Sequence, residues 1–276
     1  MNVIALDIGG TAVKYGLFFG HNEEFGQFSV YDKDGQENVQ TSLYRFLECY
    51  KADVIAISVP GPFDFQTGTS NMKHKLLSLY GVGLKKILEE KFQNVSVSFV
   101  HDSTAFAFGV MVEKPELIQD AFSCVMLGTG IGYVNVVKGV VQLNEQGTPK
   151  HPLWNMRFCD GIVEDYVSTN ALLTKAREKG CFFNNIKEMS VFARKGNDEI
   201  LDIFKGFGKQ LGRCMEYKRQ EDRFNQIVIG GQISKSFDLI REGFEKETDI
   251  PYLFVKDSSS CALYGLKAYT ERQCKE

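Results

Sequence analysis

The sequence has 276 residues, of which 43% are hydrophobic and 24% are charged, with a formal net charge of −3. This composition is ordinary for a globular protein, and the length fits two domains of typical size or one large domain. The slightly acidic balance, with no basic stripe, argues against nucleic acid and membrane surfaces as partners.

The N-terminal segment and the cysteines indicate the cellular compartment in which the protein is found. The first ten residues lack a basic region, and Asp7 interrupts their apolar run, so they do not read as a secretory signal. No stretch has the apolar length of a transmembrane helix. The seven cysteines are scattered and form no closely spaced pair, which favours free thiols and offers no ligand set for zinc. We therefore expect a cytoplasmic protein without zinc.

The chain begins with a strand, a glycine turn and a second strand. Residues 3–7 and 12–19 are rich in β-branched and aromatic residues, and Gly9-Gly10-Thr11 lies between them, which predicts a β-hairpin. Backbone N–H groups in such a turn can bind phosphate, and Thr11 adds a hydroxyl. Asp7 can face phosphate only across a cation, which indicates hydrated Mg²⁺. The alternative is a hairpin turn whose glycines serve backbone geometry alone.

Alternating helices and strands follow. The predicted elements are a helix at 43–50, a buried strand at 53–59 ended by Pro60-Gly61-Pro62, an amphipathic helix at 84–92 and a strand at 95–100. The last strand ends at His101-Asp102, and a helix is predicted from Ser103. A carboxylate at the end of a strand suits a general base, although Asp102 is also a good helix N-cap.

A second hairpin is predicted downstream. Residues 122–127 and 133–137 read as strands joined by Gly128-Thr129-Gly130-Ile131-Gly132. The spacing of the glycines differs from the dinucleotide-binding fingerprint, and no P-loop sequence occurs in the chain. Two hairpins of one kind indicate a duplicated architecture, and together they could clamp one triphosphate from both sides.

The remaining elements complete an α/β pattern. A strand at 226–229 leads through Gly230 and Gly231 into a helix, whose N-terminus can hold a polar ligand. Further helices are predicted at 162–177, 201–217 and 260–271, and a strand at 252–255. The charged stretch around Pro115 is the best internal boundary. We expect one domain at 1–113, with a C-terminal helix at 258–276 packing back on it, and a second at 114–257.

The sequence resembles the repressor/open-reading-frame/kinase (ROK) family of bacterial sugar kinases. Five segments carry the resemblance in order along nearly the whole chain: residues 7–11, 59–62, 102–105, 127–132 and 230–234. The resemblance implies an α/β fold of the actin/hexokinase (ribonuclease H-like) type, with two domains and an interdomain cleft. It also implies ATP and Mg²⁺ as cofactors and a small-molecule sugar as substrate.

Roles for residues follow from the same resemblance. Gly9, Gly10 and Thr11 would bind the γ- and β-phosphates, Gly128, Thr129 and Gly130 would oppose them, and Gly230 and Gly231 would border the adenosine. Asp102 would be the catalytic base, and Asp7 would hold Mg²⁺ through water. The sugar would contact Asn71, His101, Asp102, Glu145 and Glu164, with His74 and Lys75 nearby.

The chain departs from the family pattern around the sugar. His101 stands where the family usually has asparagine, Thr148 where it has a histidine, and the cysteine-rich zinc motif is absent. His151 and Cys159 alone are too few ligands for zinc. Glu145 can also be read as an ordinary loop carboxylate, and Glu164 as a charge in the first turn of a helix.

Three functions compete on this evidence. The first is ATP-dependent phosphorylation of a hexose or amino sugar, by resemblance at the 6-hydroxyl. The second is a sensor of sugar or nucleotide without turnover; a repressor is disfavoured because the sequence starts at the first strand. The third is an acyl-activating or protein-remodelling ATPase of the same fold, which is generally longer or carries iron–sulfur cysteines. A homodimer is the default expectation for an enzyme of this kind.

Overall fold

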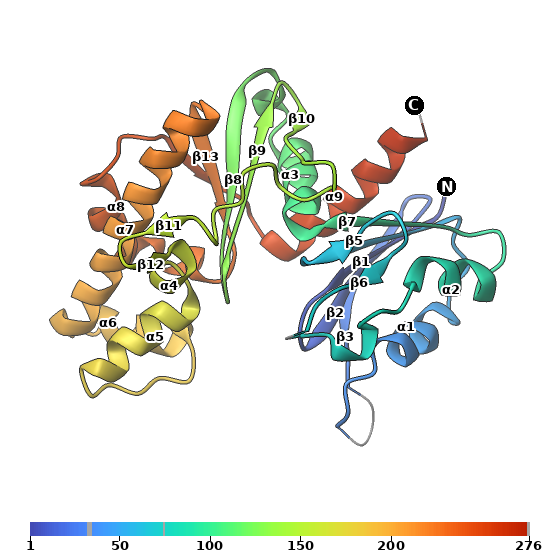
Figure 1. The fold of residues 1–276 in the computed structure, drawn as a ribbon, viewed down its shortest axis with the longest axis horizontal. Coiled ribbons are helices and arrows are strands. Elements are labelled where there is room, and N and C mark those ends of the chain that lie inside the picture. The colour runs from blue at the N-terminus through green and yellow to red at the C-terminus, as the bar shows by residue number, and fades with distance from the viewer. Residues whose placement is uncertain (32–34, 74, 275–276) are drawn as a thin grey trace. The chain divides into compact units, whose positions relative to one another are not determined.

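The computed structural model describes residues 1–31, 35–73 and 75–274, and its helices and strands are labelled in Figure 1. The chain forms two compact units. The first unit comprises Met1–Pro115, Leu143–Pro149 and Asp257–Glu276, and the second comprises Glu116–Gln142 and Lys150–Lys256. Residue 74 and the end of the predicted last helix, residues 275–276, lie outside the described residues.

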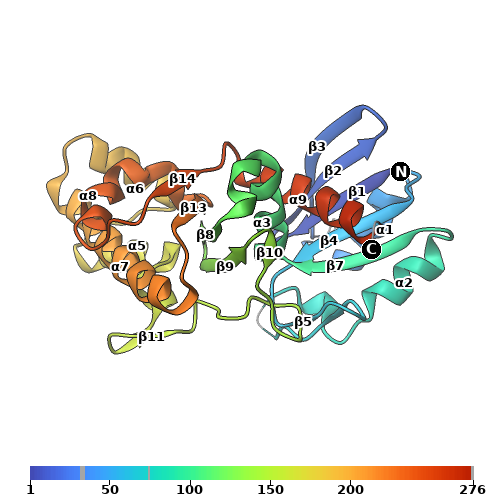
Figure 2. The same cartoon turned by 90° about the horizontal axis from the view of Figure 1, so that it is seen from above.

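The first unit is built on a five-stranded sheet. Its strand order is β3 (Asn22–Ser29), β2 (Ala12–Phe19), β1 (Val3–Ile8), β4 (Val54–Val59) and β7 (Ser96–His101), and these strands lie side by side in Figure 2. The pairs β1–β2 and β2–β3 are antiparallel, whereas β1–β4 and β4–β7 are parallel. Strand β4 is buried at every position, as expected for a central parallel strand.

Alternate residues of β1 face two different layers of helices. Ile4 and Leu6 belong to a core cluster with apolar residues of α1 (Val39–Leu47) and α2 (Leu84–Lys91). Val3 and Ala5 belong to another cluster with Leu263 of α9 (Ser258–Gln273), next to α3 (Asp102–Glu113). The strand period of two therefore distributes one apolar run over both faces.

Three short elements complete the first unit, and a fourth lies where the chain passes into the second unit. They are β5 (Phe63–Asp64), β6 (Thr69–Ser70), η1 (Leu77–Leu79) and η2 (Pro115–Gln119). β5 and β6 pair with each other just after the proline-rich end of β4. They hold the loop that carries Asn71 close to that end.

The second unit repeats this order of strands. Its sheet runs β10 (Val140–Val141), β9 (Ile131–Val137), β8 (Ala121–Leu127), β13 (Gln226–Gly230) and β14 (Tyr252–Phe254). β8 and β9 form an antiparallel hairpin, and β8, β13 and β14 are parallel neighbours. A small separate sheet pairs β11 (Arg157–Phe158) with β12 (Gly161–Ile162).

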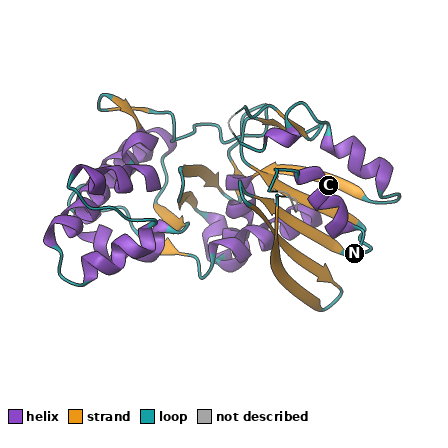
Figure 3. Ribbon diagram, turned by 90° about the horizontal axis from the view of Figure 1, so that it is seen from below, coloured by secondary structure: helices purple, strands orange, loops and turns teal. Residues whose placement is uncertain are grey.

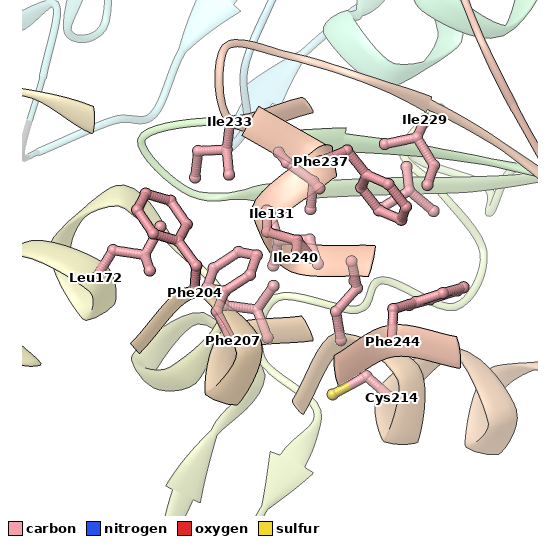
Figure 4. Packing of buried hydrophobic residues seen from close by; sticks show 14 of the residues in the cluster. Ile131, Leu172, Phe204, Phe207, Cys214, Ile229, Ile233, Phe237, Ile240 and Phe244 are labelled. Carbon is pink, nitrogen blue, oxygen red and sulfur yellow. The ribbon is translucent and has the colours of Figure 1, made fainter. Parts of the chain in front are cut away.

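Helices make up most of the rest of the second unit, and they gather together in purple on the left of Figure 3. They are α4 (Val163–Tyr166), α5 (Thr169–Glu178), α6 (Ile186–Arg194), α7 (Asp198–Asp222), η3 (Ile233–Ser236) and α8 (Phe237–Glu245). The core between them and the sheet includes Phe204 and Phe207 of α7 and Phe244 of α8 (Figure 4).

Both predicted hairpins are confirmed by the pairing of β1 with β2 and of β8 with β9. The single helix predicted at 162–177 is wrong, because the chain breaks into α4 and α5. α4 ends at Tyr166 with Val167 in its C-cap position, and Ser168 caps α5, where its hydroxyl accepts a hydrogen bond from Ala171 N at 3.2 Å. Among the described residues, none of the helices combines the length and the apolar character that a bilayer crossing needs.

Candidate active site

The turn between β1 and β2 presents free backbone donors. Gly9 N donates to Ala12 O at 3.0 Å and closes the turn. Gly10 and Thr11 are exposed, and within the described part of the chain their backbone N–H groups have no acceptor. Adjacent unpaired N–H groups in a tight turn can bind an oxyanion.

Asp7 lies beside this turn and faces a lysine across the hairpin. Asp7 pairs with Lys14 in the antiparallel register, and Lys14 Nζ lies 4.0 Å from Asp7 Oδ2. Lys14 also donates to Ser259 Oγ at 2.9 Å, and Ser58 Oγ donates to Asp7 Oδ1 at 2.8 Å. Lys14 and Ser58 are absent from the predicted site residues, and the strand register is what brings them to Asp7.

The environment of Asp7 resists its negative charge. Burial raises the pKa of the Asp7 carboxyl above its ordinary value, and the nearby Asp102 carboxylate adds to this. The hydrogen bond from Ser58 and the charge of Lys14 act in the opposite direction without cancelling the burial. A buried carboxylate with a second one near it is a setting that a cation stabilises. A single carboxylate fits Mg²⁺ held through water, because Mg²⁺ keeps most of its water ligands.

Asp102 is held through one oxygen and open at the other. Oδ1 accepts hydrogen bonds from Ser103 N at 2.6 Å and Ser103 Oγ at 3.3 Å, and it lies 2.9 Å from His101 Nδ1. Among the described residues, Oδ2 has no partner. The side chain is 39% exposed, so Oδ2 can accept a proton from an incoming hydroxyl.

Asp102 is not the N-cap that the sequence predicts. It is the first residue of α3, and His101 occupies the cap position. His101 Nδ1 also lies 3.2 Å from Ser103 N, where it could only accept. The shorter contact to the carboxylate assigns a proton to Nδ1, which then donates to Asp102.

The surroundings of Asp102 keep it ionised. Burial acts to raise the pKa of the Asp102 carboxyl, but the charge and hydrogen bond of His101 oppose it. The backbone N–H of Ser103 and the charge of Lys75 act in the same direction as His101. Together they outweigh burial, and the pKa lies below its ordinary value of 3.8. Asp102 is therefore a carboxylate at neutral pH.

Loops of the first unit converge on His101. The ring of Phe65 meets the His101 ring edge-to-face with centroids 6.0 Å apart. Gly147, in the loop that carries Glu145, packs on Phe65, since a Cβ there would lie 3.5 Å from the Phe65 ring. The Glu145 side chain itself is exposed. Asn71 is also exposed, and its backbone N donates to Pro62 O at 3.1 Å; His74 lies outside the described residues.

The second glycine turn is built like the first. Gly128 N donates to Gly130 O at 3.0 Å, and in the described structure no acceptor contacts the N–H groups of Thr129 and Gly130. Thr169, at the start of α5, donates to Gly128 O from its backbone N at 2.9 Å and from its hydroxyl at 2.8 Å. The turn is therefore fixed at one end, and two of its backbone donors are unpaired in the described structure.

Gly230 and Gly231 lie directly beside this second turn. Gly230 pairs with Met126 in the parallel register of β8 and β13. Gly231 has φ +89°, and a Cβ there would lie 2.2 Å from Leu127 O, so only glycine allows this approach. The predicted helix follows these glycines, and the chain enters α8 through the short 3₁₀ segment η3.

Glu164 lies on the second turn. Its Oε2 accepts a hydrogen bond from Ile131 N at 3.2 Å. A Cβ on Gly130 would lie only 2.0 Å from the same oxygen, so the carboxylate covers Gly130 directly. The sequence gives no signal for this contact, because α4 and the turn are far apart in the chain.

One cluster of potential metal ligands occurs in the described structure. It comprises His151, Glu221 and Asp222. His151 Nδ1 lies 2.6 Å from Asp222 Oδ1, and the buried Lys218 ammonium contacts Glu221 and lies 3.1 Å from Asp222 Oδ2. The lysine charge already occupies the place that a cation would take, so this cluster is an ion-pair network.

The two five-stranded α/β sheets, each opening with a glycine-turn hairpin, place the chain in the class with an actin/hexokinase-like fold. A ROK family model matches residues 3–263, and the protein belongs to the ROK family. This agrees with the resemblance seen in the sequence.

Solved structures share the fold. A ROK family protein from Streptococcus pneumoniae TIGR4, in complex with sucrose, aligns with a TM-score of 0.83 at 18% identity, covering 100% of this chain and 99% of the other. A ROK family glucokinase from Streptomyces griseus, in complex with glucose and AMPPNP, aligns with a TM-score of 0.78 at 18% identity, covering 99% and 100%.

Among curated relatives, a beta-glucoside kinase from Klebsiella pneumoniae is 29% identical over 134 residues, which are 48% of this chain and 45% of the relative. A beta-glucoside kinase from Listeria monocytogenes is 30% identical over 135 residues, with the same coverage. The chain thus spans about half the length of these two relatives.

Proposed function

We propose that the protein transfers the γ-phosphoryl group of ATP to a hydroxyl group of a hexose or amino sugar. The observation that carries this proposal is the asymmetry of Asp102, whose Oδ1 is fixed by three donors while Oδ2 is open. The kinase names of several ROK relatives and neighbours support it.

Residues of the first unit have separate roles in this phosphoryl transfer. Asp102 Oδ2 accepts the proton of the sugar hydroxyl as its oxygen attacks the γ-phosphorus. The bond from the γ-phosphorus to the β,γ-bridging oxygen breaks, and ADP leaves. The Gly9-Gly10-Thr11 turn binds phosphate oxygens, and Lys14 adds positive charge beside it. Asp7 would hold Mg²⁺ through water, and the ion would supply positive charge to the phosphate groups.

The remaining expected residues receive roles on the same basis. Gly128, Thr129 and Gly130 bind phosphate oxygens through the open N–H groups of their turn, and Gly230 and Gly231 border the adenosine. Asn71, His101, Glu145 and Glu164 contact the sugar, and the 6-hydroxyl is the acceptor. Residues 1–113, with the C-terminal helix at 258–276, act as one functional domain, and the segment 114–257 acts as the other.

The test combines a sugar panel with one substitution. ATP consumption is measured with hexoses, hexosamines and N-acylated sugars, and the best substrate is carried forward. Asp102→Asn keeps the size and the Ser103 hydrogen bonds but cannot take the proton. We expect kcat to fall about 10²- to 10⁴-fold while the affinity for AMPPNP is retained.

A matched control uses Asp202→Asn, which removes the same charge from an exposed position of α7 and should leave kcat unchanged. Full activity in the Asp102→Asn variant would rule out Asp102 as the base. Sugar binding without turnover on any member of the panel would favour a sensor that binds its ligands without chemistry.

A further inference from the structure

A carboxylate occupies the turn where phosphate is proposed to bind. Glu164 Oε2 accepts from Ile131 N and covers Gly130. Two anions cannot share this place at low cost, because unit charges a few Å apart in a partly buried site repel by more than thermal energy. Nucleotide binding at this turn therefore requires that the Glu164 carboxylate move or that its charge be opposed.

The side chain is the part that can move. The backbone of α4 is anchored, since Val163 N donates to Met156 O at 3.0 Å and Glu164 N donates to Trp154 O at 3.1 Å. The turn is anchored as well, through Thr169. The Glu164 side chain is only half-buried, and among the described residues a single long hydrogen bond of 3.2 Å holds its carboxylate. Rotation about its own torsions releases the turn without moving either element.

We propose that Glu164 couples the sugar and nucleotide sites. Without sugar, its carboxylate occupies the second glycine turn and weakens the binding of triphosphate. When a sugar hydroxyl donates to Glu164, the carboxylate leaves Ile131 N, and the turn gains a free N–H group and loses a negative charge. This inference rests on the proposed function. The contact of Glu164 with the glycine turn and its contact with the sugar are then two alternative positions of one side chain.

Such coupling must be reciprocal. If sugar binding raises the affinity for nucleotide by some factor, nucleotide binding raises the affinity for sugar by the same factor. The consequence for the reaction is that ATP binds weakly while water is the only acceptor present, which limits wasteful hydrolysis.

The decisive measurement is the affinity for Mg²⁺–AMPPNP in the absence of sugar, by calorimetric titration. Glu164→Gln keeps an oxygen that accepts from Ile131 N and removes the charge. We expect this variant to bind AMPPNP about five- to tenfold more tightly than the wild type, which corresponds to roughly 1–1.4 kcal/mol. Glu178→Gln, an equal change of charge at an exposed position of α5, should leave the affinity unchanged.

The outcomes separate this inference from the proposed function. If the wild type binds AMPPNP and Glu164→Gln binds it equally or more weakly, the coupling is overturned and the kinase proposal stands. If neither protein binds AMPPNP, both proposals fail. A purely structural role of Glu164 would lower the affinity in the variant rather than raise it.

A second measurement uses the wild-type protein and does not depend on how the variant folds. The Ile131 amide resonance is followed by NMR while the sugar chosen from the panel is added. Loss of the carboxylate acceptor should move this resonance upfield and speed its hydrogen exchange, and the affinity for AMPPNP should rise. An Ile131 amide that does not respond to a bound sugar contradicts the proposal.

Discussion

The pair His101 and Asp102 shows how one substitution in a motif can tune a base. The ROK pattern has asparagine before this aspartate, and the present chain has an imidazole that lies 2.9 Å from the carboxylate. A protonated His101 stabilises the charged form of Asp102 more strongly than a neutral amide would. The histidine therefore acts on the proposed reaction through the carboxylate.

The pH dependence of the reaction tests this role. The pKa of Asp102 is lowered in the folded protein, so the base stays ionised as the pH falls, until the pH passes below the ordinary value of 3.8. His101→Asn removes a positive charge, which should raise the pKa of Asp102. We expect the acid limb of the kcat/KM profile to move to higher pH in this variant.

The control for this experiment is His21→Asn, which removes an exposed histidine at the turn between β2 and β3 and should leave the profile in place. An acid limb that coincides in wild type and His101→Asn would show that His101 does not tune Asp102. A loss of rate at all pH values without a shift would assign His101 to sugar contact alone.

Other residues near Asp7 illustrate what a sequence pattern cannot reveal. Lys14 lies in the middle of a strand, and only the antiparallel register of β1 and β2 brings it opposite Asp7. Ser58 reaches Asp7 because β4 is the parallel neighbour of β1. The Ser58 contact depends on strand pairing across a long sequence separation, and the Lys14 contact depends on the register of the hairpin, which local patterns do not specify.

At the scale of elements, the C-terminal end of α7 anchors a distant loop. Lys218 is 1% exposed, and its ammonium donates to His151 O at 3.1 Å and lies 3.1 Å from Asp222 Oδ2. Tyr133 donates to the same carboxylate at 2.6 Å and presents its ring to Lys218, with 4.9 Å between Nζ and the ring centroid. The network joins α7, β9 and the segment at His151.

Breaking this network should destabilise the protein. Lys218→Met keeps the buried stem and removes the charge, which leaves the Asp222 carboxylate without its closest cation in a largely dry site. We expect a loss of about 3–5 kcal/mol in the free energy of unfolding, measured by urea denaturation. Lys209→Met, at an exposed position of the same helix, should change stability by less than about 0.5 kcal/mol.

The same network has a defined response to acid. Burial acts to raise the pKa of Asp222, but the hydrogen bonds from Tyr133 and His151 and the charge of Lys218 outweigh it, and the pKa is lowered. The stabilisation is complete above the unfolded value near 3.8 and is lost as the pH falls through the lower folded value. The difference in stability between wild type and Lys218→Met should therefore shrink in acid, and an equal difference at pH 7 and pH 3 would contradict this account.

Elements with strong local patterns were predictable, and those defined by context were not. The two hairpins combine β-branched runs with glycine turns, so their existence and type follow from the sequence. Strand β3 carries mostly polar, exposed residues at the edge of its sheet, and α6 has exposed Val191 and Phe192 that blur its apolar face. For these reasons the sequence pattern predicts neither element.

On the scale of the whole molecule, the chain leaves its first unit and later returns to it. After α3, residues 116–142 and 150–256 build the second unit, and α9 then packs against α3 and the first sheet. The helices approach closely at two glycines, because a Cβ on Gly265 would lie 1.8 Å from Ala105 O and one on Gly109 would lie 1.8 Å from Cys261 O.

The close packing of α3 against α9 can be tested by adding one methyl group at a glycine. Gly265→Ala forces a Cβ into backbone that cannot move aside as a side chain would. We expect a loss of at least about 1–3 kcal/mol in the free energy of unfolding, and faster hydrogen exchange in α3 and α9. Gly206→Ala in α7, where a Cβ meets nothing within 4 Å, should instead be neutral or stabilise by up to about 1 kcal/mol. A Gly265→Ala protein as stable as wild type would mean that the helices can separate slightly without cost.

The place of α9 in the chain also bears on synthesis. The strands of the first sheet leave the ribosome early, but the helix that shields Val3 and Ala5 is translated only after residue 256. The nascent chain therefore carries a bare apolar surface through the whole time in which residues 116–256 are made. Chaperones therefore have the opportunity to bind this surface until α9 has been made.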